Sequence, residues 1–441
     1  MRLVQPSFLS TLACSVVRQL KSRNTFATRR HSSSSYSGYN PLFDDAPDRR
    51  ATSSLKWTKY GPDILPLWVA DMDFRAPQCV IDAMHARAEH GVYGYSVPRE
   101  EVTQAVIKYL ERTAHYKVEP EWIVWSHGLV PALTVAARMA GGAGDSVMTN
   151  TPIYPPFLWT PKTADMQTLQ VPLRFDEDLG QWRMDLAKME SLVTPRTKMF
   201  TLCNPHNPVG KVFTAQELGE LGDFCKRHDL VLLSDEIYHD LILEPDRTPH
   251  VPIAALGDAD LMKRTIILHA ASKTYNVPGL SCAYAVIPDI ELRTRFKRAA
   301  RGFVTEINAF GYESLHASYT GGEEWRQAML SYLRGNRDFL VHFIKTRIPL
   351  LRPYSNHDAT YLLWVDTSAL APYLSQGVEA ATFFLENAQV AVSDGRDFGV
   401  FHHVRINFGC PRARLQIGLE NMERAINDVV AAAEKSPRAK D

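Results

Sequence analysis

The chain has 441 residues, and 49 Lys and Arg balance 49 Asp and Glu, so its formal net charge is zero. A neutral chain makes a poor nucleic-acid binder, because contact with phosphates needs an excess of positive side chains. No apolar run approaches the ~20 residues that cross a bilayer, so no membrane partner is expected either. The six cysteines are scattered without a C-x-x-C pair. This spacing argues against a structural zinc site, and no bound metal is expected.

The N-terminus differs in composition from the rest of the chain. From Met1 to Phe43 there is no Asp or Glu, several arginines are present, and Ser32–Ser35 form a serine run. This composition is typical of a mitochondrial transit peptide, although a leader without a targeting role fits it equally well. We therefore expect residues 1–43 to be a disordered leader or a transit peptide. The expected location is cytoplasmic or mitochondrial, and the globular body starts near Asp44.

From about Pro77 to Ala300, short apolar segments alternate with amphipathic ones. The segment Thr214–His228 is predicted to be a helix, since Thr214 and Glu217 stand at capping-box spacing before its apolar face. Such alternation predicts an α/β fold with a mostly parallel sheet that helices cover on both faces. Ligands bind at the carboxyl ends of such strands. The predicted strands are Ser146–Thr149, Lys198–Leu202, Leu230–Leu233, Thr265–Leu268 and Ala283–Ile287.

Polar clusters follow three of these strands. They are Asn204–Gly210 (N-P-H-N-P-V-G), Ser234–Tyr238 (S-D-E-I-Y) and Ala271–Asn276 (A-S-K-T-Y-N). Taken singly, each is common as a turn, a helix cap or a surface pair. Three such clusters in this order at successive strand ends are hard to reach by chance, and together they indicate a ligand site.

The residue types at these positions suit pyridoxal phosphate as the cofactor. This cofactor needs a lysine that holds it covalently and moves protons, and Lys273 fits. Its ring nitrogen needs a buried carboxylate that keeps it protonated, and Asp235 fits because it directly follows an apolar strand. The ring oxygen needs donors, the phosphate needs N–H groups at a helix start together with hydroxyls, and the ring needs an aromatic cover. Asn207 and Tyr238 are the candidate donors to the ring oxygen. The candidates for binding the phosphate are Gly128, Leu129 and Ser272, and Tyr154 is the candidate aromatic cover of the ring.

From about Tyr39 to Val430 the sequence resembles fold-type-I enzymes of the class I/II aminotransferase superfamily. The N-P-x-N-P-x-G, S-D-E-x-Y and S-K-T-x-N motifs carry this resemblance, and they occur in the family's order. It implies a PLP-dependent transferase-like fold, with a large cofactor-binding domain and a smaller α/β domain built from both chain ends. The expected boundaries are 44–76 and 326–441 for the small domain and 77–325 for the large one.

The resemblance also implies a homodimer whose active sites share residues across the interface. On the family pattern, Arg405 would bind the substrate α-carboxylate, a task that suits its planar guanidinium. Tyr93 would act at the partner's site, where it would contact the cofactor phosphate and the substrate. Tyr95 is the alternative for that role.

Three features resemble the cystathionine β-lyase and C–S lyase branch more than the aminotransferases. They are Trp68–Phe74 (W-V-A-D-M-D-F), Asn407–Arg412 (N-F-G-C-P-R), and Ser281 in place of a phosphate-binding arginine eight residues after Lys273. The branch implies a lyase that cleaves a cysteine-derived thioether to thiol, pyruvate and ammonia. The thioether itself stays open among cystathionine, a simple cysteine conjugate and a larger adduct.

The alternative is an aminotransferase of aromatic or sulfur amino acids, which uses the same residues for the first half of its reaction. A cofactor-binding regulator without turnover is disfavoured, since a protein without catalysis has no reason to keep the complete set of residues.

Overall fold

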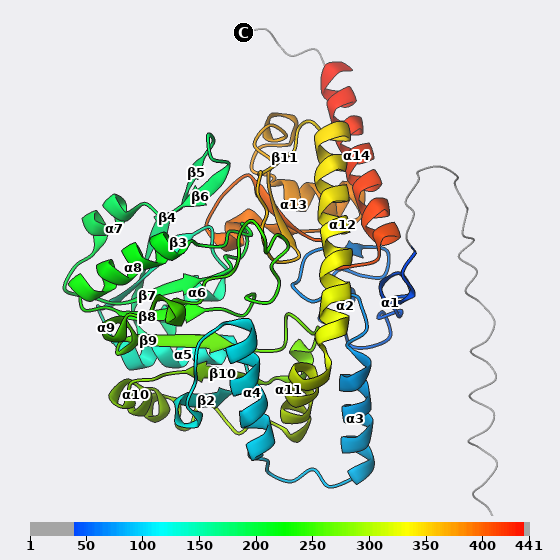
Figure 1. Ribbon diagram of the computed structural model, residues 1–441. Helices are drawn as coiled ribbons and strands as arrows, with labels where there is room; N and C mark the ends of the chain where they lie inside the picture. Colours follow the sequence, from blue (N-terminus) through cyan, green and yellow to red (C-terminus); the bar gives the residue numbers. More distant parts are fainter. Residues whose placement is uncertain (1–38, 436–441) are drawn as a thin grey trace, which may run out of the picture. The chain divides into compact units, whose positions relative to one another are not determined.

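The computed structural model describes residues 39–435, so nearly all of the predicted leader lies outside the described residues. The larger of its sheets has seven strands in the order β2-β10-β9-β8-β7-β3-β4 (Figure 1). All neighbours are parallel except β10, which runs antiparallel to both β2 and β9. The strands are β2 Ile123–Ser126, β3 Ser146–Thr151, β4 Gln167–Pro172, β7 Thr197–Cys203, β8 Val231–Asp235, β9 Thr265–His269 and β10 Ala283–Val286.

Successive residues along the central strands enter two separate cores, one on each face of this sheet. Met199 and Leu233 lie in one core, whereas their neighbours Phe200 and Leu232 lie in the other. Helix α5 (Leu129–Ala140) packs into the first core and α8 (Ala215–Arg227) into the second, so they cover opposite faces. Sheets buried on both faces need near-continuous apolar strands, and this requirement explains the apolar runs in the sequence.

The sequence predictions for these elements are confirmed. All five predicted strands are present, and α8 has the full capping box between Thr214 and Glu217. The predicted fold class, a mostly parallel sheet covered by helices with a smaller second sheet, is confirmed as well. The exact boundaries between the domains stay predictions.

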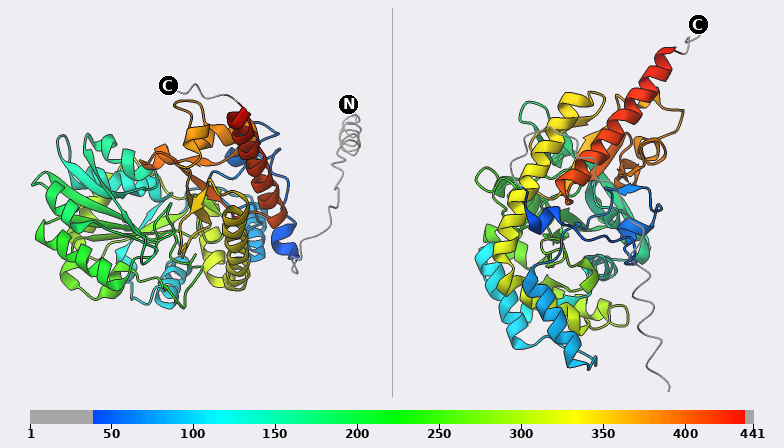
Figure 2. Two further views of the ribbon diagram at one scale, coloured as in Figure 1. Left: turned by 90° about the horizontal axis from the view of Figure 1, so that it is seen from above. Right: turned by 90° about the vertical axis from the view of Figure 1, so that its right-hand side faces the viewer.

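The second sheet is built from the C-terminal part of the chain. It has the antiparallel order β11-β12-β15-β14, and helices α12 (Glu323–Arg347) and α14 (Arg412–Lys435) pack together beside it (Figure 2). The N-terminal segment joins this part through β1 (Leu65–Pro66), which pairs with β13 (Val390–Ala391). The strands of the sheet are β11 Arg352–Pro353, β12 Leu362–Asp366, β14 Ser393–Asp394 and β15 His403–Asn407.

Other helices and one hairpin complete the described part of the chain, in which no helix is long and apolar enough to span a membrane. The helices are α1 Pro41–Asp44, α2 Leu55–Thr58, α3 Gln78–His90, α4 Glu100–Thr113, α6 Pro156–Trp159, α7 Leu186–Leu192, α9 Ala259–Met262, α10 Ile290–Ala300, α11 Ala309–Gly321 and α13 Ala380–Phe383. The hairpin is β5 Arg174–Asp176 with β6 Gln181–Arg183.

A buried charge cluster holds the irregular segment 68–74 in place. The Asp73 carboxylate is fully buried and lies 3.3 Å from Lys56 Nζ, 3.0 Å from Arg49 Nη1 and 2.8 Å from Arg414 Nη1. Trp57 Nε1 also donates to it at 3.0 Å. Burial alone would raise the pKa of Asp73, but Lys56 and Arg414, together with the donated hydrogen bonds, lower that pKa to about 2.

Replacing Asp73 with asparagine is expected to lower the free energy of unfolding by roughly 3–5 kcal/mol at pH 7, because it removes the nearer carboxylate from buried Lys56 and leaves only that of Asp71, 3.8 Å away. The pKa of Asp73 is about 2 in the folded protein and about 3.9 in the unfolded chain. This difference means that the ionised carboxylate contributes roughly 2–3 kcal/mol to the free energy of unfolding. This part is present above about pH 4 and is lost as the pH falls towards 2.

Urea unfolding of the native chain and of Asp73→Asn at pH 7 and pH 3 checks this prediction. The difference in the free energy of unfolding between the two proteins is expected to be smaller at pH 3 than at pH 7. Asp48→Asn, on a largely exposed carboxylate paired with Arg50, is the control and should change stability by less than about 0.5 kcal/mol. An equal difference in the free energy of unfolding at both pH values would contradict the prediction.

Candidate active site

The predicted residues from the strand ends gather around one cavity of about 180 Å³. Eight of the ten residues singled out from the sequence line it: Gly128, Leu129, Tyr154, Asn207, Asp235, Tyr238, Ser272 and Lys273. The ninth, Arg405, contacts the cavity wall, and the tenth, Tyr93, lies elsewhere. The cavity stands at the carboxyl ends of β7, β8 and β9, where parallel sheets of this kind bind ligands.

Lys273 follows β9 and projects into the cavity. Its Nζ donates a 2.7 Å hydrogen bond to the backbone oxygen of Ala70, in the segment that the Asp73 cluster holds. Burial lowers the pKa of Lys273 to about 8, although Asp71 acts in the opposite direction. An amine with a pKa near 8 gains and loses a proton readily close to neutral pH, as a proton carrier must.

Asp235 is the last residue of β8 and the only acidic side chain lining this cavity within the described part of the chain. One of its carboxylate oxygens accepts a 3.1 Å hydrogen bond from the Ile237 N–H. Burial raises the pKa of Asp235 to about 7, because the hydrogen bond and nearby Lys273 offset the loss of water only in part. Such a carboxyl group favours a cationic partner inside the cavity.

Arg405, on β15, is 4% exposed, and its guanidinium forms no ion pair with a carboxylate of residues 39–435. Nη1 donates to Asn207 Oδ1 at 3.0 Å, and Nη2 donates to Trp68 O at 2.9 Å and to Ser393 Oγ at 3.2 Å. Its Nε is buried and has no hydrogen-bond partner. A buried cation without a carboxylate in direct contact is costly, so this geometry suits an incoming anion such as a carboxylate.

One end of the cavity is lined by the first turn of α5. Gly128 precedes this helix with an extended backbone, and the first N–H groups of a helix have no partner within it. Ser272 and Ser281 also line the cavity, and Ser281 adopts a left-handed backbone with φ of 51°. Together these groups form a site for a phosphate that relies on helix N–H groups and hydroxyls rather than on an arginine.

Several residues of this site are not among those predicted from the sequence. Ile237 lines the cavity between Asp235 and Tyr238, and Cys203 and Cys282 also contribute to the wall. Their apolar or weakly polar side chains carry no chemical signature. The position of Ile237 inside the S-D-E-I-Y motif is the one signal that could have identified it.

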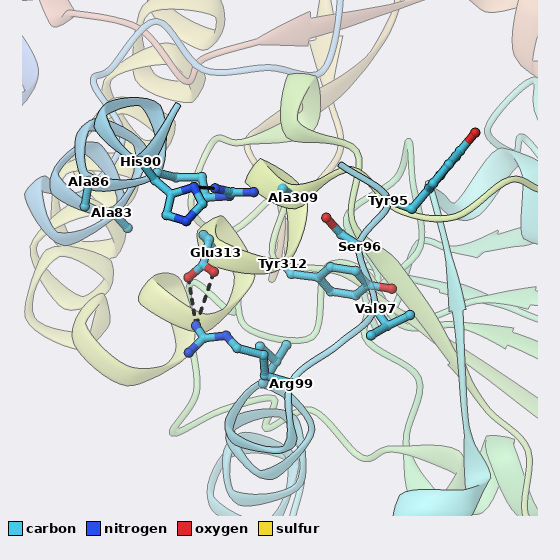
Figure 3. Close-up of a pocket in the computed structure, with 12 residues that line it drawn as sticks. Ala83, Ala86, His90, Tyr95, Ser96, Val97, Arg99, Ala309, Tyr312 and Glu313 are labelled. Atoms are coloured by element: carbon cyan, nitrogen blue, oxygen red, sulfur yellow. Dashed lines mark hydrogen bonds and ion pairs between the residues drawn. The ribbon is translucent and has the colours of Figure 1, made fainter. Parts of the chain in front are cut away.

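The predicted partner-site residues lie on the connection between α3 and α4, away from the cavity. The Tyr93 hydroxyl donates to Ala88 O at 2.8 Å, and its ring stacks on Phe310 at 5.8 Å. Tyr95, in contrast, is 102% exposed. Figure 3 shows the Tyr95 ring directed away from the Arg99–Glu313 ion pair, at the edge of a second cavity of about 650 Å³.

Comparison with known proteins places the chain in a family. Residues 62–422 match the family model described as aminotransferase class I and II, and the chain belongs to this family. The chain is 34% identical to the cystathionine β-lyase PatB of Bacillus subtilis (strain 168), over 87% of this chain and 100% of PatB.

Two solved structures share the fold closely. The crystal structure of OvoB is 41% identical, with a TM-score of 0.82, and the match covers 88% of this chain and 99% of that one. The PLP-bound C–S lyase from Staphylococcus hominis is 30% identical, with a TM-score of 0.81, over 88% of this chain and 99% of that one. The predicted family and fold are thus confirmed.

Proposed function

We propose that this chain is a pyridoxal-phosphate-dependent C–S β-lyase that cleaves a cysteine-derived thioether to a thiol, pyruvate and ammonia. The observation that carries the proposal is the convergence of Lys273 and Asp235 in one cavity, with Arg405, whose guanidinium has no carboxylate partner among residues 39–435, beside it. The names of the relatives, a cystathionine β-lyase and a C–S lyase, support this chemistry over transamination.

The residues present fit the cofactor in charge and in space. Asp235, with its raised pKa, suits a protonated ring nitrogen, and Arg405, with its free Nε, suits the substrate carboxylate. A Cβ added at Gly128 would meet only Pro131 Cδ, at 3.9 Å, so the space before α5 is open for a phosphate. Tyr154 and Ile237 line the cavity and would contact the ring, and Asn207 and Tyr238 could donate hydrogen bonds to its oxygen.

Bound pyridoxal phosphate supplies the electron sink for carbanion chemistry at the substrate Cα. Lys273 would hold the cofactor, and its free amine would take the proton from the substrate Cα as a general base. Asp235 would keep a proton on the ring nitrogen. Arg405 binds the α-carboxylate and thereby orients the Cα–H bond towards Lys273, an arrangement that lowers the entropic cost of reaction. The Cβ–S bond would then break, the departing sulfur would take up a proton to give the thiol, and water would convert the remaining three-carbon unit to pyruvate and ammonia.

A product assay tests the proposal. The purified holoenzyme receives cystathionine or an S-alkyl cysteine without any keto acid, and pyruvate, free thiol and the cofactor absorbance are followed together. Sustained release of pyruvate and thiol in equal amounts is expected. A cofactor spectrum that converts once, stops, and resumes only after a keto acid is added would instead identify the aminotransferase.

We also propose a homodimer in which the α3–α4 connection of one subunit reaches the other subunit's cavity. The exposed apolar side chains on this connection support it, since isolated chains rarely display such a group: Val92, Tyr93, Tyr95 and Val97 are each at least 60% exposed. Of the two tyrosines, Tyr95 is the better candidate for contact with the partner's phosphate, because the Tyr93 hydroxyl already has an acceptor within its own subunit.

Replacing Tyr95 with phenylalanine is expected to weaken cofactor binding about tenfold, the effect of losing one hydrogen bond to a charged group. Tyr93→Phe is the matched variant and should change the affinity less than twofold. Titration of the apo-protein with pyridoxal phosphate, followed by tryptophan fluorescence, measures both. The reverse ranking would restore Tyr93 as the residue that crosses the interface.

A further inference from the structure

The buried imidazole of His206 joins two loops that line the cavity, although its own side chain does not line it. His206 is 1% exposed, in the turn that carries Asn207. Its Nε2 lies 2.7 Å from the backbone oxygen of Pro152, two residues before Tyr154. The imidazole is thus a direct polar link between the Asn207 turn and the Tyr154 loop.

The protonation state of the ring decides which of its contacts is a hydrogen bond. Nδ1 faces the Cys203 oxygen at 3.2 Å, so both ring nitrogens face acceptors. Burial lowers the pKa of His206 to about 4, against the effect of both carbonyl groups, and the ring is therefore neutral at pH 7. A neutral imidazole has one N–H, and the shorter contact assigns it to Nε2, which donates to Pro152 O.

The contacts around His206 form a closed circuit. From His206 the chain passes to Asn207, whose Oδ1 accepts from Arg405 Nη1 at 3.0 Å. The Arg405 guanidinium lies 4.7 Å from the centre of the Phe398 ring. The Phe398 backbone oxygen accepts from the Ile153 N–H at 3.1 Å, and Ile153 directly follows Pro152. The turn itself is closed by backbone hydrogen bonds between His206 and Lys211 and between Gly210 and His206, each of 2.8 Å.

We propose that His206 is a positioning residue that, through its hydrogen bond to Pro152, fixes the Tyr154 loop and Asn207 relative to Arg405. Without this bond, Tyr154 and Asn207 are no longer held in fixed positions relative to Arg405. Binding of the cofactor ring at Tyr154 and binding of the substrate carboxylate at Arg405 are then both weakened. The proposal rests on the proposed function, since it assigns the circuit to the cofactor and substrate sites.

Three variants test it. His206→Leu removes the donor and keeps much of the apolar volume, whereas His206→Gln keeps an N–H donor at a similar reach. Val209→Ala is the packing control, because Val209 is a 4% exposed residue of the same turn that does not line the cavity. Each apo-protein is titrated with pyridoxal phosphate. Each holoenzyme is assayed for kcat and KM with cystathionine or an S-alkyl cysteine, whichever the native protein cleaves in the product assay.

His206→Leu is expected to raise the cofactor Kd and the substrate KM about tenfold each, the factor that one buried hydrogen bond gives. We expect His206→Gln to restore both values to within about threefold of native, and Val209→Ala to leave both within twofold. Equal behaviour of the leucine and glutamine variants, or a tenfold weaker Kd in Val209→Ala, would overturn the proposal.

Two further outcomes are informative. If His206→Leu does not fold, a glutamine variant that binds the cofactor tenfold more weakly than Val209→Ala overturns the proposal, and one that matches the control supports it. A native protein that binds the cofactor but releases no pyruvate would count against the proposed function alone, because the Kd comparison still tests His206.

Discussion

Replacing Lys273 with alanine is expected to abolish pyruvate release, with a fall in kcat of at least about 10⁴-fold, since the variant loses both the covalent anchor and the proton carrier. No other lysine lines the cavity in the described part of the chain, so no neighbouring amine takes over. The variant should still fold, because Lys273 donates a single hydrogen bond, to Ala70 O, and the Tyr361 hydroxyl also donates to that oxygen, at 3.0 Å.

Pyruvate and thiol assays measure this effect, and thermal unfolding of the variant checks its fold. Lys211→Ala is the matched control, since Lys211 is a 4% exposed lysine paired with Glu217 at 3.0 Å and lies outside the cavity lining. It is expected to cost stability but to keep kcat within about tenfold of native. Partial recovery of Lys273→Ala by added ethylamine would support the role as a base. Pyruvate release above about 1% of native would refute the assignment.

The features that the sequence predicted correctly are those with a regular spacing or a distinctive chemistry. Helix α8 was predicted because its apolar positions repeat with the helical period and Thr214 and Glu217 form its cap. Lys273, Asp235 and Asn207 were predicted because each follows an apolar strand, and parallel strands end at one edge of a sheet. These three residues therefore lie close together because the sheet topology places the ends of their strands side by side.

The features that the sequence did not reveal depend on backbone groups and on pairing between distant segments. Ser393 contacts Arg405 because β14 pairs with β15 in the register that sets these two residues opposite each other. The oxygens of Trp68 and Ala70 accept from Arg405 and Lys273, but a backbone oxygen leaves no trace in the residue type. Such contacts require the fold to be known first.

Replacing Asp235 with asparagine is expected to lower kcat about 10³-fold while KM changes much less. The amide keeps nearly the same shape but carries no negative charge, and no second acid lines the cavity in residues 39–435 to replace it. A preorganised charge in a buried site has effects of this size on catalysis. Without the cofactor, burial raises the pKa of Asp235 to about 7. When the cofactor is bound, a cationic ring nitrogen beside the carboxylate stabilises its ionised form. The charge therefore acts mainly when the cofactor is bound.

Asp240→Asn separates this charge effect from the general cost of altering a buried aspartate. Asp240 is 5% exposed in the segment that follows β8, and it contacts Tyr109 and His239 instead of the cavity. It is expected to lower the unfolding free energy but to keep kcat within about tenfold of native. Pyruvate assays give kcat for both variants, and a pH titration of the cofactor absorbance shows whether the ring nitrogen loses its proton at lower pH in Asp235→Asn. If Asp235→Asn instead keeps kcat within tenfold of native, another group must hold that proton, and the assignment of Asp235 fails.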